Sequence, residues 1–144
     1  MIIIRDTREK NGWNFIDYDA SIDSTKLDVG DYAIKTYENK IAIERKKGIS
    51  ELYNNISPKN RERFLGTMAR LIRTVEHPFM VIEANLGDLF YGVPYSKISP
   101  NYVFSVLLTL QIQGLNIIWA GNRGEEVTYL LLKKYIDKCQ TKPK

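Results

Sequence analysis

The chain has few of the residues that most often build cofactor and covalent sites. Of its 144 residues, one is a cysteine, Cys139, and one is a histidine, His77. A single cysteine cannot form an intrachain disulfide, and a single histidine excludes a His-rich metal site. Walker-type phosphate loops, Gly-x-Ser-x-Gly elbows and zinc-ligand spacings are all absent from the sequence. These absences exclude disulfide scaffolds, zinc fingers and the common nucleotide-binding loops.

Long hydrophobic runs are also missing. The apolar start, residues 1–4, meets Arg5 and Asp6 at once, and is too short for a signal peptide or a membrane span. We therefore expect no membrane association, and a cytoplasmic protein. Hydrophobic residues make up 44% of the chain, enough for one compact core. We expect a single domain over residues 1–139 and a polar tail at 140–144.

Hydrophobic periodicity predicts an α/β fold with a mixed central β-sheet flanked by helices. Ser50, Ser57 and Ser99 are the predicted N-caps of three helices, and Pro78 is predicted to lie just after the second of them. The later strands are almost entirely apolar, so we expect them to be buried on both faces. The predicted strands are Ile2–Arg5, Asp31–Thr36, Lys40–Lys46, Phe79–Glu83 and Asn116–Ala120. The predicted helices are Glu51–Ile56, Pro58–Val75, Pro100–Gln113 and Glu125–Lys138.

Two acids and a lysine stand at the hairpin predicted for residues 31–46. Asp31 opens one strand, and Glu44 and Lys46 close the next. Because side chains alternate along a strand, Glu44 and Lys46 share one face while Arg45 points to the other. Two carboxylates that meet repel each other unless a cation lies between them, and Mg²⁺ needs only one or two of them. The pattern predicts a magnesium site for phosphodiester hydrolysis, with Lys46 holding the attacking water or offsetting charge on phosphorus.

Further acids could complete this site. Asp6 follows the first strand and Glu9 lies three residues on, so either is a candidate to bind the metal directly or through water. Glu51, at the start of the next helix, is another candidate. The spacing Asp-x(n)-Glu-x-Lys is loose, however, and an exposed ion pair between Glu44 and Lys46 is the alternative interpretation.

Basic residues follow the predicted site. Residues 40–73 hold nine basic and three acidic side chains, a formal excess of +6 against +4 for the whole chain. Such cations could position a DNA backbone without reading its sequence, although a solvated helix face is the alternative. The candidate DNA contacts are Arg8, Arg45, Lys47, Lys59, Arg61 and Arg63.

The motifs taken together resemble the nuclease domain of the XPF family of structure-specific endonucleases. The family signature is Gly-Asp, a variable gap, Glu-Arg-Lys, three residues and Asp, with an upstream Asp-x-Arg-Glu. Here four residues separate Lys46 from Glu51, so the last acid is longer and displaced by one position. The resemblance covers essentially the whole chain and includes the compact forms found in phages and mobile elements. The matching segments are Ile4–Glu9, Val29–Tyr32, Ile43–Lys46, Glu51–Leu52, Asn60–Phe64, Phe79–Glu83 and Asn116–Asn122.

The resemblance implies a restriction-endonuclease-like core that depends on Mg²⁺, for which Mn²⁺ can substitute. It makes Asp31 and Glu44 metal ligands and Lys46 the catalytic lysine, and it matches Asp6 and Glu9 to acids that support metal binding or catalysis. It implies cleavage of branched, flap or junction DNA. It also implies a homodimer or a heterodimer with a related subunit, for which the predicted helices 99–113 and 125–138 offer apolar faces. We expect no helix-hairpin-helix domain in this chain.

Two other functions are compatible with the sequence. A catalytically inactive DNA-binding or scaffold subunit of a nuclease complex would share the fold, although such domains typically lose the acids that are present here. An α/β domain that binds another phosphate ligand is the third possibility.

Overall fold

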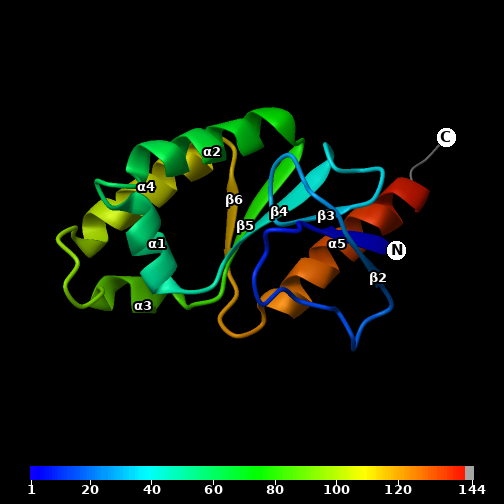
Figure 1. Cartoon of the computed structure of the whole chain (residues 1–144), viewed down its shortest axis with the longest axis horizontal. Helices are drawn as coiled ribbons and strands as arrows, with labels where there is room; N and C mark the ends of the chain where they lie inside the picture. The colour runs from blue at the N-terminus through cyan, green and yellow to red at the C-terminus, as the bar shows by residue number, and fades with distance from the viewer. Residues whose placement is uncertain (142–144) are drawn as a thin grey trace.

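The computed structural model describes residues 1–141, which form one six-stranded mixed sheet with helices on both faces (Figure 1). The strands lie in the order β2-β1-β3-β4-β5-β6. The strands are β1 Ile2–Arg5, β2 Ser21–Ser24, β3 Tyr32–Ile34, β4 Ile41–Lys46, β5 His77–Ile82 and β6 Asn116–Trp119. The helices are α1 Ile49–Ile56, α2 Arg61–Thr74, α3 Leu86–Tyr91, α4 Pro100–Ile112 and α5 Gly124–Thr141.

Strand β3 divides the sheet into two parallel parts. It runs antiparallel to both neighbours, β1 and β4, whereas β1 with β2, β4 with β5, and β5 with β6 are parallel pairs. Tyr32 pairs with Ile43, so the predicted hairpin is confirmed. The predicted α/β class with a mixed sheet is confirmed as well.

Hydrophobic cores lie on both faces of the sheet. On one face, Leu52, Met68 and Leu107 bring α1, α2 and α4 against Ala42 and its neighbours. On the other, Leu132 joins α5 to Ile43 and the residues around it. Figure 1 shows α5 on the opposite side of the sheet from α1, α2 and α4. Strand β5 is fully buried over residues 80–82, as predicted, whereas β6 forms the sheet edge and is only half-buried.

The boundary between α1 and α2 differs from the prediction. Ser57 ends α1 and does not cap α2: its hydroxyl donates to the Asn54 carbonyl at 2.8 Å. Residues 57–60 then form a turn, and α2 begins at Arg61. Proline suits the second position of such a turn as well as a helix start, which is why Pro58 was misleading. Ser50 lies inside α1 and does not cap it, whereas Ser99 caps α4 as predicted, accepting from the Tyr102 amide at 3.1 Å.

Two short elements were not predicted. β2 contains a single apolar residue, Ile22, so its sequence has no strand periodicity, and it exists because β1 offers it a parallel edge. α3 has a capping box in which Asn85 and Asp88 each accept from the other's backbone amide. That Asn-x-x-Asp spacing was the signal that could have located it.

The ends of the last elements also differ. Pro78 lies within β5, one residue before the ladder to β6 begins at Phe79. α5 extends to Thr141, so the first two residues of the predicted tail are helical, and residues 142–144 lie outside the described part. Among the helices of residues 1–141, none is long and apolar enough to cross a bilayer.

Candidate active site

Asp31 is fixed against β4 by the backbone. Gly30 precedes it with φ +79°, and a Cβ there would lie 3.2 Å from the Ala42 Cβ, so glycine allows the chain to approach β4 closely. The Asp31 amide donates to the Ile43 carbonyl at 2.7 Å, and Asp31 Oδ2 accepts from the Arg45 amide at 2.7 Å. These two bonds hold the Asp31 carboxylate beside the residue between them, Glu44.

Glu44 and Lys46 lie on the same face of β4, as the alternation predicted. Lys46 Nζ is 3.1 Å from Glu44 Oε2 and 3.7 Å from Glu51 Oε2. The Lys46 side chain is only 5% exposed and lies over the Phe64 ring of α2, whereas Glu51 is 38% exposed. The exposed ion pair considered from sequence is therefore not what forms, because the lysine is buried between two acids. Glu51, despite its displaced position, reaches the same lysine.

The buried carboxyl groups of the site resist ionisation. Burial, together with repulsion from Glu44, raises the pKa of Asp31 well above its usual value. Burial also raises the pKa of Glu44, and Lys46 offsets only part of that effect. Burial acts to lower the pKa of Lys46, but Glu44 and Glu51 outweigh it and raise that pKa, so the ammonium stays charged. A second cation beside Asp31 and Glu44 would relieve the repulsion that Lys46 leaves.

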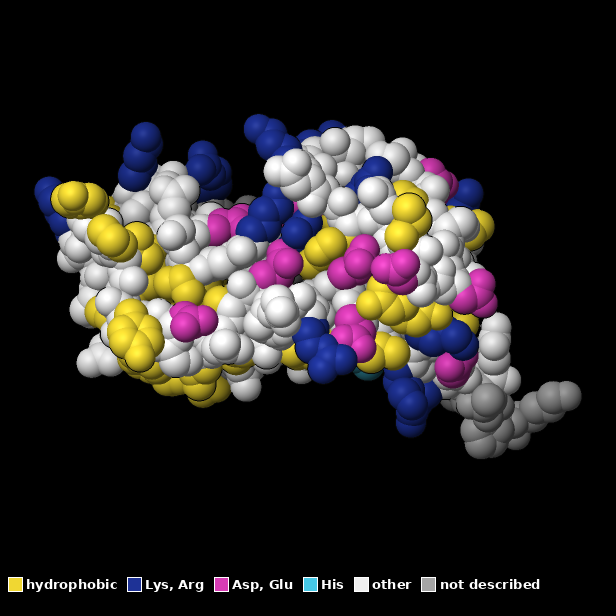
Figure 2. All heavy atoms as spheres, turned by 90° about the horizontal axis from the view of Figure 1, so that it is seen from below, with side chains coloured by type: hydrophobic (Ala, Val, Ile, Leu, Met, Phe, Trp, Pro, Cys, Tyr) yellow, Lys and Arg dark blue, Asp and Glu magenta, His cyan; other side chains and the backbone are white. Residues whose placement is uncertain are grey.

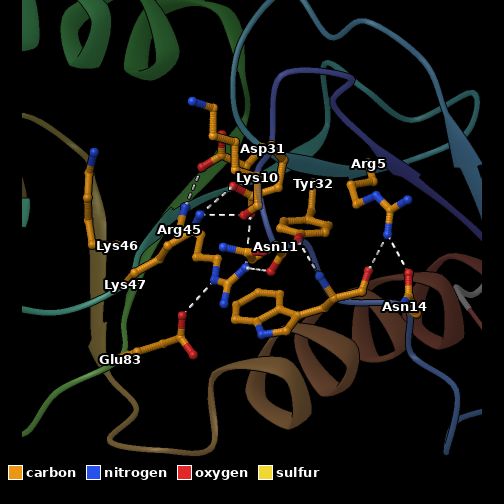
Figure 3. A network of polar contacts seen from close by, with 12 residues as sticks. Arg5, Lys10, Asn11, Asn14, Asp31, Tyr32, Arg45, Lys46, Lys47 and Glu83 are labelled. Atoms are coloured by element: carbon orange, nitrogen blue, oxygen red, sulfur yellow. Dashed lines mark hydrogen bonds and ion pairs between the residues drawn. The ribbon is translucent and has the colours of Figure 1, made fainter.

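Arg45 points to the opposite face of β4, as predicted, and is 9% exposed. Its Nε donates to Glu83 Oε1 at 2.6 Å, its Nη1 donates to the Asn11 carbonyl at 3.0 Å, and its guanidinium stacks on Trp13 at 4.1 Å. Figure 3 shows Lys46 pointing away from this network. The geometry gives Arg45 a structural role, tying residues 9–13 to β4 and β5, and leaves it little surface for DNA.

Glu83, the partner of Arg45, was not selected from the sequence. It follows β5, which lies parallel to β4, and parallel strands end at the same edge of a sheet. The sequence signal for Glu83 was an acid that directly follows a buried strand, at the sheet edge where the Glu44-Arg45-Lys46 strand also ends.

Asp6 is buried at 3% exposure, and both of its oxygens are engaged. Oδ2 accepts from Arg8 Nε at 2.9 Å, and Oδ1 accepts from the Leu27 amide at 2.8 Å. Burial opposes ionisation, but the hydrogen bonds from Arg8 and Leu27 prevail and lower the pKa of Asp6. The Asp6 amide also donates to the Asp31 carbonyl at 2.9 Å. Asp6 therefore anchors the backbone beside Asp31.

Glu9, in the loop after β1, and Lys47, which directly follows β4, form an ion pair near the site. Glu9 Oε2 is 3.4 Å from Arg45 Nη1, and Glu9 Oε1 is 3.8 Å from Lys47 Nζ. Lys47 also donates to the Lys10 carbonyl, and its amide donates to Glu51 Oε1 at 2.8 Å. Glu9 is close enough to Asp31 and Glu44 to contribute to raising their pKa values.

The predicted DNA contacts differ in accessibility. Lys59, in the turn before α2, and Arg63, in the first turn of α2, are exposed, and Arg8 is 63% exposed although it is paired with Asp6. Arg61 instead stacks on the Tyr102 ring at 4.6 Å and donates to the Ile56 carbonyl at 3.1 Å, so it links α2 to α4 and α1.

The donor set at Asp31 and Glu44 fits a divalent cation. Two adjacent, partly buried carboxylates supply the oxygen ligands that suit a hard cation which keeps several of its waters. Within residues 1–141, no three acidic, histidine or cysteine side chains gather as a metal site. The structure thus brings together Asp31 and Glu44 but does not add Asp6 to them as a third ligand.

The ERCC4 domain model matches residues 5–132, which is most of the chain. The chain belongs to the ERCC4 domain family. This ERCC4 domain is 29% identical over 143 residues to the putative ATP-dependent RNA helicase MJ1505 of Methanocaldococcus jannaschii. The match covers 99% of this chain and 16% of the helicase.

Solved structures show the same fold. XPF from Aeropyrum pernix superimposes with a TM-score of 0.70 at 18% identity, over 99% of this chain and 63% of that chain. The same protein in complex with DNA gives a TM-score of 0.71 at 18% identity, over 95% of this chain and 65% of that chain. The ERCC4 domain thus spans less than two thirds of the XPF chains it matches. The predicted resemblance to the XPF family and the restriction-endonuclease-like fold are confirmed.

Proposed function

We propose that this ERCC4 domain is a metal-dependent DNA endonuclease that hydrolyses phosphodiester bonds. The observation that carries the proposal is the buried lysine beside two converging carboxylates: Lys46 Nζ lies 3.1 Å from Glu44, and Asp31 is pinned next to Glu44 by the Arg45 amide. A structural role alone would not favour this arrangement, because burying two repelling carboxylates costs stability.

In this proposal Asp31 and Glu44 hold one Mg²⁺ or Mn²⁺ ion. When bound, the ion would polarise the scissile phosphate and make hydroxide available near neutral pH. Lys46 stays charged, so it donates hydrogen bonds to the attacking water and offsets negative charge that develops on phosphorus. Glu51 contacts the Lys46 ammonium on the side away from Glu44 and so helps to orient it. The Asp6 amide donates to the Asp31 carbonyl and so positions the backbone of Asp31.

The overall reaction is a hydrolysis. The water oxygen forms a bond to phosphorus and releases a proton to solvent, and the bond from phosphorus to the leaving sugar oxygen breaks. That oxygen keeps the electron pair and takes up a proton. The products are one strand ending in a phosphomonoester and one ending in a hydroxyl.

The proposed substrate is branched DNA, such as a flap, a fork or a junction. Support comes from the XPF motifs, from the basic residues Lys59 and Arg63 near the site, and from the structural relative described in complex with DNA. A cytoplasmic location, with the protein associated with the nucleoid or with phage DNA, follows from this substrate and stays a prediction.

Dimerisation, which the family resemblance implies, also stays a prediction. Exposed hydrophobic side chains are concentrated between residues 86 and 112 and include Leu108 and Ile112 of α4, while Leu130 of α5 is exposed on the other face. Figure 2 shows hydrophobic side chains gathered at the end of the molecule that carries α3 and the loop after it. Sedimentation velocity with Tyr91→Lys, and with Ile16→Lys as an equally exposed control, tests this surface: only Tyr91→Lys should reduce the fraction of dimer.

The alternative function is a catalytically inactive DNA-binding or scaffold subunit. The presence of Asp31, Glu44 and Lys46 in one site favours the enzyme. Calorimetric titration with Mg²⁺ separates the two functions, since a scaffold would bind DNA tightly without binding the metal at Asp31 and Glu44.

The proposal is tested with labelled flap, fork, junction and duplex DNA, each incubated with Mg²⁺, Mn²⁺ or EDTA. We expect metal-dependent cleavage of at least one branched substrate by the wild type and none by Asp31→Asn. Equal cleavage by Asp31→Asn would refute the assignment of the site. Failure to bind any DNA at low salt, where basic contacts are strongest, would favour a different phosphate ligand.

A further inference from the structure

A groove lies between α1 and the loop that joins α3 to α4, at the end of the molecule away from α5 (Figure 1). Its volume is about 370 Å³. Its lining residues come from α1, between Ser50 in the first turn and Ser57 at the C-terminal cap, and from residues 93–98 of the loop. The groove therefore extends along the whole helix, which at eight residues is about 12 Å long.

Tyr95, in this loop, is fully exposed and has a backbone conformation that tyrosine rarely adopts. The Ser96 amide donates to the Val93 carbonyl at 3.1 Å and closes a turn with Pro94 and Tyr95 at its centre. Tyr95 has φ +66°, and after a proline in such a turn this conformation usually belongs to glycine or asparagine. Because the ring is fully exposed, no packing within the chain offsets the strain. Strained residues of this kind cluster where ligands bind, so Tyr95 points to a ligand.

The groove offers the groups that a single nucleic-acid strand requires. The faces of unpaired bases stack on exposed aromatic rings such as that of Tyr95, whereas in a duplex those faces are covered by neighbouring base pairs. Lys97 is the one charged side chain among the lining residues, all of which lie in the described part of the chain, so no carboxylate in the groove repels a phosphate. Neutral hydroxyl and amide groups complete the lining and include those of Ser50, Asn54, Ser57 and Ser96.

Both ends of α1 connect this groove to the proposed nuclease centre. Ser50 directly precedes Glu51, whose Oε2 atom lies 3.7 Å from Lys46 Nζ. At the other end of the helix, Pro58 lines the groove and directly precedes the exposed Lys59. An unpaired strand that leaves the site near Lys46 can therefore enter the groove at the first turn of α1.

We propose that the groove binds the unpaired strand of a branched DNA, with a base stacked on Tyr95 and the backbone beside Lys97. The inference rests on the proposed nuclease function and narrows its substrates. A flap or a fork, which has a single-stranded arm, uses the groove, whereas a fully paired junction does not. A second copy of this chain is the competing occupant, although Tyr91, which tests the dimer surface, does not line the groove.

The test is the fluorescence anisotropy of a labelled oligothymidine and of a duplex of the same length, both in EDTA so that neither is cut. We expect Tyr95→Leu to bind oligothymidine about tenfold more weakly, because leucine stays apolar but removes the ring on which a base stacks. Its affinity for the duplex should stay within about twofold of the wild-type value. Tyr95→Phe keeps the ring and should bind oligothymidine as the wild type does.

Tyr91→Leu is the matched control. Tyr91 is 90% exposed but does not line the groove, so this variant should bind both DNAs with wild-type affinity. Tyr95→Gly should bind oligothymidine as weakly as Tyr95→Leu without a lower melting temperature, because glycine adopts the positive φ without strain. Lys97→Ala should lower the slope of log Kd against log salt for oligothymidine by about 0.7.

Three results would overturn the inference. They are wild-type affinity of Tyr95→Leu for oligothymidine, an equal loss of affinity in Tyr91→Leu, and an equal loss for the duplex. If Tyr95→Leu instead reduced the fraction of dimer in sedimentation velocity and left DNA affinity unchanged, the groove would belong to a second copy. These measurements need no cleavage, so a wild type that cuts no DNA but depends on Tyr95 to bind oligothymidine would refute the nuclease function and retain the groove.

Discussion

Asp31 and Glu44 set the chemistry of the site because burial raises the pKa of both carboxyls and Glu44 makes Asp31 still harder to ionise. A lone carboxylate at a strand end would be solvated, but here the Arg45 amide and the Ile43 carbonyl fix Asp31 beside Glu44. Lys46 is shared with Glu51 and so compensates the pair incompletely. At the scale of single residues, the site is thus a pair of acids that favours the arrival of a cation.

Asp31→Asn should therefore stabilise the metal-free protein. Asparagine can still accept from the Arg45 amide but removes the repulsion, and each kcal/mol gained corresponds to about 2–4 °C in melting temperature. Mg²⁺ should raise the melting temperature of the wild type and leave that of the variant unchanged, because only the wild type retains both ligands. Thermal unfolding in EDTA and in Mg²⁺ measures both effects. A variant that melts below the wild type in EDTA would contradict the repulsion.

Asp6→Ala should have the opposite effect on stability. It leaves the buried Leu27 amide without its acceptor, and we expect unfolding free energy to fall by about 2–3 kcal/mol. Asp28→Ala, which removes an exposed ion pair with Arg70, should cost less than about 1 kcal/mol. Because Arg8 and Leu27 lower the pKa of Asp6 despite burial, its contribution is present at neutral pH and is lost as the pH falls through that lowered pKa. Urea unfolding should therefore show a smaller loss of stability for Asp6→Ala at pH 3 than at pH 7. Equal losses at the two pH values would contradict this role of Asp6.

At the scale of elements, β4 serves both faces of the sheet at once. Its alternation sends Glu44 and Lys46 towards α1 and α2, and sends Arg45 towards Glu83 and the loop of residues 9–13. One strand of six residues therefore places the proposed chemistry on one side and its structural support on the other.

Arg45→Met should unfold far more easily than the wild type. It keeps an apolar stem against Trp13 but leaves Glu83 without its cation and Glu9 with Lys47 alone, a type of change that costs about 3–5 kcal/mol. Arg123→Met, in an exposed pair with Glu126, is the control and should cost less than about 1 kcal/mol. A loss of similar size in the two variants, measured by urea unfolding, would remove Arg45 from its structural role.

The sequence predicted which residues converge better than it predicted where the helices and strands begin and end. Gly30-Asp31 and the Glu44-Arg45-Lys46 alternation located the hairpin and both of its faces, because strand periodicity is local. The network around Arg45 and the engagement of Asp6 with the Leu27 amide depend on contacts between distant residues, which no local pattern encodes. The same reason explains why β2 was missed, since it forms only by pairing with β1. It also explains the turn at Ser57, because a Ser-Pro sequence can begin either a turn or a helix.

At the scale of the whole molecule, the site shares its side of the sheet with the basic residues at the start of α2, while α5 carries lysines on the other side. Lys59 and Arg63 are exposed near the start of α2, and Arg63 borders a small hollow next to Lys46. α5, with Lys134 and Lys138 exposed, covers the other face. A DNA backbone that reaches Lys46 should therefore contact α2 and not α5.

The double variant Lys59→Ala/Arg63→Ala should reduce the salt dependence of DNA binding. Each lost phosphate contact lowers the slope of log Kd against log salt by about 0.9 for duplex DNA, so we expect a reduction of about 2. Lys134→Ala/Lys138→Ala removes the same charge from the opposite face and should leave the slope unchanged. Fluorescence anisotropy between low and physiological salt gives both slopes, and equal slopes for the two variants would place the DNA elsewhere.

The most direct test of the proposed nuclease centre compares two adjacent lysines. Lys46 is 5% exposed between Glu44 and Glu51, whereas Lys47 is 38% exposed and lies beside Glu9. The measurement is the Mg²⁺-dependent single-turnover cleavage of one labelled branched DNA at saturating protein. We predict that Lys46→Met loses at least about 100-fold in rate, as expected for a donor that acts in the transition state, while Lys47→Met stays within about threefold of the wild type. Equal rates for Lys46→Met and the wild type would contradict a catalytic centre at Asp31, Glu44 and Lys46.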